Sequence, residues 1–138
     1  MILLNKKKKY YKKLIEQIQR DIWLEELKQV GRKGLREKIR LDFDQTADKI
    51  KGIEEAIEKV KADTKIDSKQ RESDLAQLYD AKHKFELDKD KLQEQMMGKY
   101  IESEGKYHGG LDEEIGLYNK HIEGRDELIT LIKIELRK

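Results

Sequence analysis

The chain has 138 residues, 31 Lys/Arg against 29 Asp/Glu, and 43% charged residues, compared with about 25% in an average globular domain. Its formal net charge is only +2 and Leu, Ile, Val and Phe make up about a quarter of it, which argues against general disorder. The absence of cysteine excludes disulfides, thiolate metal ligands and a cysteine nucleophile.

The residue types favour helix throughout the chain. There is no proline, the residue that breaks helix interiors, and the abundant Lys, Glu and Leu are good helix formers. We therefore predict an all-α protein of three to four long helices, arranged as a single elongated domain over residues 1–138.

The first residues do not resemble a secretory signal. Such a signal places its charges before an apolar run of about 7–15 residues. Here the short apolar stretch of Met1 to Leu4 precedes the lysines. No stretch approaches the roughly 20 apolar residues that span a bilayer. We expect a cytoplasmic protein and no membrane partner.

A basic N-terminal helix is predicted over about 6–30. Its main apolar stripe, at spacings of three and four, consists of Tyr11, Leu14, Ile15, Ile18 and Ile22. Trp23, Leu27 and Val30 lie on a different side, so the helix either contacts two neighbours or bends near Asp21. Gly31 and Gly34 predict a break, with Gly31 as a left-handed C-terminal cap.

The cleanest pattern begins after that break. Spacings of four and three predict a helix over about 35–63 with the seam Leu35, Ile39, Phe43, Thr46, Ile50, Ile53, Ile57 and Val60. A second heptad run predicts a helix over about 68–104, capped by Asp67 or Ser68 and carrying Lys82 and Lys89 on its seam. We expect the two helices to form an antiparallel coiled-coil hairpin.

A glycine-rich loop over 105–110 then leads into a C-terminal helix over about 111–137. The end of this helix is unusually apolar and covers a wide face. Ile132, Ile134 and Leu136 alternate with charged residues, which leaves a short strand as the alternative over 128–137. Because a single partner helix needs less apolar width, we predict a homodimer or a complex with another protein. The predicted partner-binding residues are Trp23, Leu27, Leu128, Ile129, Leu131, Ile132 and Leu136.

The charges are distributed unevenly: residues 1–40 hold 13 Lys/Arg and five Asp/Glu, whereas residues 41–138 hold 18 and 24. The densest basic run contains Lys6, Lys7, Lys8, Lys9, Tyr10, Tyr11, Lys12 and Lys13. Lysines of this kind contact phosphates and tyrosines stack on bases, so nucleic-acid binding through 6–40 is one interpretation. Anionic lipid is another, and a solubilising or self-docked end is the third.

Candidates for catalysis or metal binding are few. His83, His108 and His121 are the three histidines, and Asp80 and His83 share one helical face. Ferritin-like di-metal sites use a Glu-x-x-His motif twice with two further glutamates, and no second copy exists here. We predict no catalytic, metal or cofactor site. The predicted function is a non-enzymatic helical protein–protein interaction module, of the adaptor, scaffold or inhibitor type, with a nucleic-acid-binding accessory protein as the alternative.

Overall fold

Helices account for 86% of the chain, which confirms the all-α expectation apart from one small sheet. The computed structural model describes residues 2–138, and the side chains from residue 5 onward. Its elements in chain order are α1 (Ile2–Ala62), α2 (Ser68–Met97), β1 (Gly98–Ile101), β2 (Lys106–Gly109) and α3 (Leu111–Arg137).

The contacts divide the chain into two compact units. Unit 1 contains the residues up to Leu35 together with Leu111–Lys138, and unit 2 contains Arg36–Gly110. Helix α1 contributes residues to both units.

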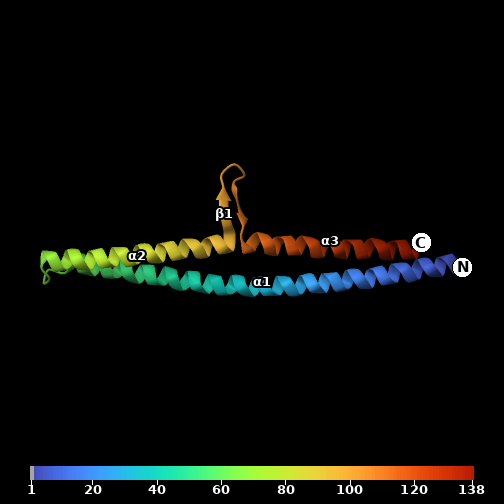
Figure 1. Cartoon of the computed structure of the whole chain (residues 1–138), viewed down its shortest axis with the longest axis horizontal. Coiled ribbons are helices and arrows are strands. Elements are labelled where there is room, and N and C mark those ends of the chain that lie inside the picture. Colours follow the sequence, from blue (N-terminus) through green and yellow to red (C-terminus); the bar gives the residue numbers. More distant parts are fainter. Residues whose placement is uncertain (1) are drawn as a thin grey trace. The chain divides into compact units, whose positions relative to one another are not determined.

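In unit 1, α3 lies beside the first part of α1 and runs in the opposite direction, so both chain ends lie at one end of the unit (Figure 1). The buried core of unit 1 is formed by Ile18, Ile22, Ile129 and Ile132. Partly buried neighbours pack against it, namely Tyr11, Leu14, Ile15, Ile122 and Leu136. The apolar stripe predicted for the N-terminal helix is therefore the inner face of this pair.

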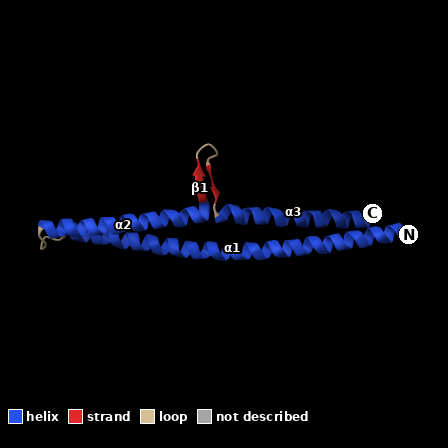
Figure 2. Cartoon of the chain, viewed as in Figure 1, coloured by secondary structure: helices blue, strands red, loops and turns tan. Residues whose placement is uncertain are grey.

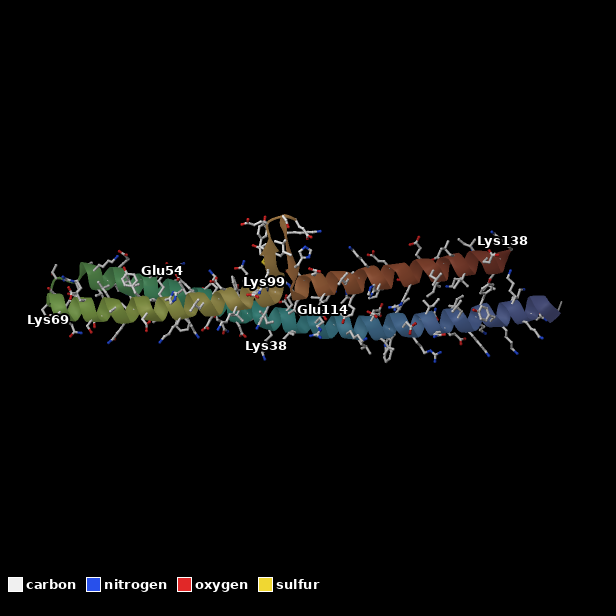
Figure 3. The ribbon with its side chains drawn as sticks, turned by 45° about the horizontal axis from the view of Figure 1, so that its top comes forward. Lys38, Glu54, Lys69, Lys99, Glu114 and Lys138 are labelled. Carbon is white, nitrogen blue, oxygen red and sulfur yellow. The ribbon has the colours of Figure 1, made fainter. Side chains whose placement is uncertain are left out.

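In unit 2, α2 runs antiparallel to the second part of α1, and the buried side chains are Ile39, Ile50, Ile57 and Met96. The ammonium group of Lys89 lies 5.3 Å from the centre of the Phe43 ring, and that of Lys49 lies 5.5 Å from the Phe85 ring. Lys82 pairs with Glu54 at 3.6 Å (Glu54 is labelled in Figure 3). Of the two seam lysines, Lys89 thus contributes a cation–π contact and Lys82 an ion pair.

The connection between α1 and α2 follows the predicted turn. Asp67 is the N-cap of α2, and its Oδ1 accepts a hydrogen bond from the Gln70 amide at 2.7 Å. Arg71 donates to the carbonyl oxygen of Asp63, which ties the turn to the first turn of α2. Near the end of α1, a hydrogen bond with Tyr79 and the charge of Glu58 raise the pKa of Lys61.

The predicted break at Gly31–Gly34 is wrong, because α1 continues without interruption from Ile2 to Ala62. Neither glycine has a positive φ, so Gly31 is not a left-handed cap. The apolar pattern does pause there, but the heptad spacing continues through polar residues. Glu25, Gln29, Arg32 and Arg36 occupy the seam positions between Ile22 and Ile39.

The predicted helix over 98–104 is also wrong. Helix α2 ends at Met97, and β1 and β2 form an antiparallel hairpin beyond it (Figure 2). Gly98 has φ +84°, and a Cβ atom on it would lie 1.9 Å from the carbonyl oxygen of His108. This backbone approach requires glycine and turns the chain out of the helix. The predicted loop over 105–110 accordingly contains β2.

The predicted C-terminal helix over about 111–137 is confirmed. Helix α3 runs from Leu111 to Arg137, so residues 128–137 are helical and the alternative of a short strand is wrong. Asp112, Glu113 and Glu114 lie in its first turn, where negative charge stabilises the helix dipole.

Candidate protein-binding surface

The middle of the inner face of unit 1 is polar. Arg125 Nη1 lies 3.2 Å from Glu25 Oε1, and His121 Nδ1 lies 4.0 Å from Glu25 Oε2. The Glu25 side chain is only 16% exposed. Arg125 occupies a heptad position between Ile122 and Ile129, so an ion pair replaces an apolar contact in the seam.

The polar stretch continues along both helices toward the start of α3. The buried side chain of Gln29 donates from Nε2 to Asn119 Oδ1, and the same nitrogen lies 3.5 Å from the Ile115 carbonyl oxygen. Arg32 Nε lies 2.9 Å from Glu114 Oε1, at the beginning of α3 (Glu114 is labelled in Figure 3). Directional contacts of this kind fix the register of two helices more strictly than apolar contacts.

The opposite side of the same segment of α1 is apolar and exposed. We call Trp23, Leu24, Leu27 and Val30 the outer stripe. Trp23 is 58% exposed, Leu27 51% and Val30 67%. At 100° per residue, Leu27 lies about 150° around the helix from the line through Ile22 and Gln29. Over residues 23–30, α1 therefore turns polar side chains toward α3 and apolar side chains away from it.

The apolar end of α3 divides between core and surface. Ile129 and Ile132 belong to the buried core of unit 1, and Leu136 packs against it, so these three residues contribute to the interior of the unit. Leu128 and Leu131 are exposed, at 46% and 56%. Of the seven predicted partner-binding residues, Trp23, Leu27, Leu128 and Leu131 are accessible.

The basic N-terminal run is partly docked and partly free. Lys7 Nζ lies 3.8 Å from Glu135 Oε1 and 5.7 Å from the centre of the Tyr11 ring, and Tyr11 packs against the core. Tyr10 is exposed. Five further lysines of the run are exposed and form no ion pair with any side chain that the structure describes: Lys6, Lys8, Lys9, Lys12 and Lys13.

The histidines do not gather into a site. Asp80 pairs with Lys84 at 3.4 Å, while His83 is exposed, and His108 contacts Glu104 within the hairpin. Within residues 2–138, no group of three or more His, Asp or Glu side chains is placed to hold a metal ion. Nor does this described part contain a helix long and apolar enough to cross a membrane.

The hairpin is a feature that the sequence interpretation missed. Tyr100 and Tyr107 lie opposite each other in the register, with ring centroids 5.0 Å apart in an edge-on arrangement, and both are exposed. At the base of the hairpin, Lys99 pairs with Glu94 of α2 at 3.7 Å. Two short segments with a central tyrosine, separated by a glycine-containing loop, were the available signal.

Comparison of the chain with protein-family models, with curated proteins and with solved structures gives no match.

Proposed function

We propose that this protein is a non-enzymatic protein–protein interaction module of the adaptor, scaffold or inhibitor type, and that it binds its partner through the outer stripe of unit 1. The observation that carries the proposal is the accumulation of Trp23, Leu24, Leu27 and Val30 on a side of α1 turned away from α3. Scattered exposed leucines are normal, whereas a contiguous apolar patch around a tryptophan is typical of an interface.

The heptad spacing of the inner seams supports a second element of the proposal. We infer that both helix pairs pack as antiparallel coiled coils. A coiled coil of two helices needs one apolar seam on each helix, which α1 already supplies through Ile18, Ile22 and Ile39. The outer stripe exceeds that need, and it suits the groove or face of a further helix.

The test compares two variants of α1 that carry the same new charge. Leu27→Glu places a carboxylate in the outer stripe, and Gln17→Glu places one at an exposed position of the same helix outside the stripe. Each tagged protein is used to capture proteins from an extract of its own cells, followed by mass spectrometry. We expect the wild type and Gln17→Glu to retain the same partner and Leu27→Glu to lose it. Equal retention by all three proteins would contradict the proposal.

A second candidate function has its own support. The exposed lysines of the N-terminal run, with Tyr10 exposed among them, present positive charge and an aromatic ring together. Such a surface favours sequence-independent binding of nucleic-acid phosphates, with Tyr10 available to stack on a base.

A further inference from the structure

Two glycines beside the outer stripe make no contact with the described residues that requires glycine. Glycine is among the least favourable residues in a helix interior, yet Gly31 and Gly34 lie deep inside α1. A Cβ atom at either position would meet nothing within 4 Å, and neither residue has a positive φ. Gly52, Gly116 and Gly124 have equally open surroundings. Gly31 and Gly34 differ in lying one turn beyond Leu27 and Val30, on the side of the outer stripe.

In an antiparallel pair of copies, the side chains of segment 23–34 in one copy match those of the same segment in the other copy in size. Trp23, Leu27, Val30 and Gly34 follow one another at spacings of four, three and four and fall within about 60° of the helix circumference. A two-fold axis between residues 28 and 29 places Trp23 opposite Gly34 and Leu27 opposite Val30. On one flank of the stripe, the same axis brings Leu24 next to Gly31 of the other helix, with an offset of two residues or about 3 Å along the helix axis. Each antiparallel pair of helices thus places the largest side chain, that of Trp23, against Gly34, which has no side chain, at two positions.

The charges that border the segment are complementary about the same axis. Glu26 and Lys33 lie on the other flank of the stripe, where the axis brings Glu26 of one copy next to Lys33 of the other with the same offset of two residues, and both side chains are exposed. Neither forms an ion pair within the part of the chain that the structure describes. An antiparallel arrangement therefore supplies two opposite-charge pairs that a single chain leaves unmade.

We propose that a second copy of this chain covers the outer stripe, with the two α1 helices packed antiparallel and related by a two-fold axis between residues 28 and 29. This inference rests on the proposed function and names its partner. Isologous two-fold interfaces are the commonest form of self-association, and they require the self-complementary surface found in residues 23–34. The glycines allow the two helix backbones to approach closely around the Trp23 side chains.

A parallel arrangement of the same stripes fits less well. It would place Trp23 against Trp23 and Gly34 against Gly34, which overfills one layer and empties another. It would also leave Glu26 without an opposite charge. The segment is about 17 Å long, so the interface lies at the small end of specific interfaces, below about 1,200 Å². We therefore expect a dimer that dissociates on dilution.

The test uses two variants, each with one of the two charges reversed. The mass of each protein is measured by sedimentation equilibrium over a range of concentrations. At high concentration, the wild type should approach twice the 16.4 kDa of one chain. Glu26→Lys alone and Lys33→Glu alone each create two like-charge pairs, which should weaken the dimer by at least about tenfold. An equimolar mixture of the two variants restores both opposite-charge pairs and should dimerise like the wild type.

A glycine variant tests the packing independently of the charges. Gly34→Gln adds a side chain in the space assigned to Trp23 of the other copy, so it should weaken the dimer. It should also raise the melting temperature of the dilute monomer, because glutamine is a better helix former. Gly52→Gln, in unit 2 and equally open, should raise the melting temperature without affecting the dimer.

Each outcome decides between the inference and its alternatives. A mixture that remains as weak as its two components would overturn the antiparallel arrangement. A wild type that stays at 16.4 kDa at several hundred micromolar would overturn self-association altogether. If Leu27→Glu still lost a captured partner in that case, the proposed function would stand with a different protein on the stripe. If it lost none, both would fail.

Discussion

The two units place their polar and apolar residues differently around α1. In unit 2, the seam positions Ile39, Ile50 and Ile57 are buried, and polar side chains cover the rest of the helix surface with only scattered apolar exceptions such as Leu41. In unit 1, the seam becomes polar at Glu25 and Gln29 while the opposite side becomes apolar. Unit 2 thus buries most of the apolar side chains that α1 contributes to it, whereas α1 of unit 1 leaves a contiguous group of apolar side chains exposed.

The largest expected effect concerns the seam of unit 2. Ile57→Asp buries an unpaired carboxylate at a position that is 3% exposed and should lower the free energy of unfolding by about 3 kcal/mol or more. Lys51→Asp, exposed on the same helix, should change it by no more than about 0.5 kcal/mol. Urea unfolding followed by circular dichroism measures both, and similar losses would show that Ile57 is not a seam residue.

A substitution in the β1–β2 hairpin of unit 2 should have a local effect on stability of intermediate size. Gly98→Ala forces a Cβ atom to 1.9 Å from the His108 carbonyl oxygen, which should release the pairing of β1 with β2 at a cost of about 2 kcal/mol. Gly105→Ala has a similar positive φ but nothing within 4 Å, so it should cost only about 1 kcal/mol and keep the strands paired. The amide chemical shifts of Tyr100 and Tyr107 report the pairing. Unchanged shifts in Gly98→Ala would contradict the assigned register.

A smaller effect is expected from the polar seam of unit 1. Arg125→Met removes the closer of the two partners of Glu25, whose side chain is 16% exposed, and should destabilise the chain by about 1–2 kcal/mol. Adding Glu25→Met should recover the loss, because well-packed apolar residues commonly replace a buried ion pair without destabilising the fold. If the two substitutions destabilised the chain additively, the ion pair would not be the contact that matters at this position.

The sequence predicted most of this architecture and missed two parts of it for physical reasons. Periodic apolar residues revealed the antiparallel helices and the turn at Asp67, because burial imposes that period. The continuity of α1 was missed because Glu25, Gln29 and Arg32 keep the heptad spacing with polar side chains that a hydrophobic pattern does not register. The hairpin was missed because strands of only a few residues leave a weak pattern in the sequence. Its formation also depends on the close backbone contact at Gly98, which a sequence pattern does not show.

The sequence singled out part of the exposed apolar surface. Trp23 and Leu27 stood out because they left the main stripe of their helix, and both are exposed. Ile129 and Ile132 looked equally suited to a partner, but width alone does not tell which part of an apolar face its own chain covers. That choice depends on the register of α3 against Ile18 and Ile22, which is a property of the tertiary structure.

Substitutions in the N-terminal lysine run should hardly change the stability of the protein. If the run binds phosphates, they should measurably weaken nucleic-acid binding. Changing Lys8, Lys9, Lys12 and Lys13 to Gln should flatten the slope of log affinity against log salt by nearly 4, because each phosphate that a lysine neutralises adds about 0.9 to that slope. Fluorescence anisotropy with a labelled duplex measures the slope. A wild type that does not bind at low salt would exclude this second candidate function.

The most direct test of the outer stripe uses the one tryptophan of the chain as its own probe. Trp23 is 58% exposed in the single chain and, in the proposed contact, is covered at the position opposite Gly34 of the other copy. Acrylamide quenching of its fluorescence should be strong at nanomolar concentration and should decrease as the protein is concentrated and a second copy covers the stripe. Quenching that is weak at every concentration would show that Trp23 is buried within its own chain, and the assignment of an outward apolar face to unit 1 would be wrong.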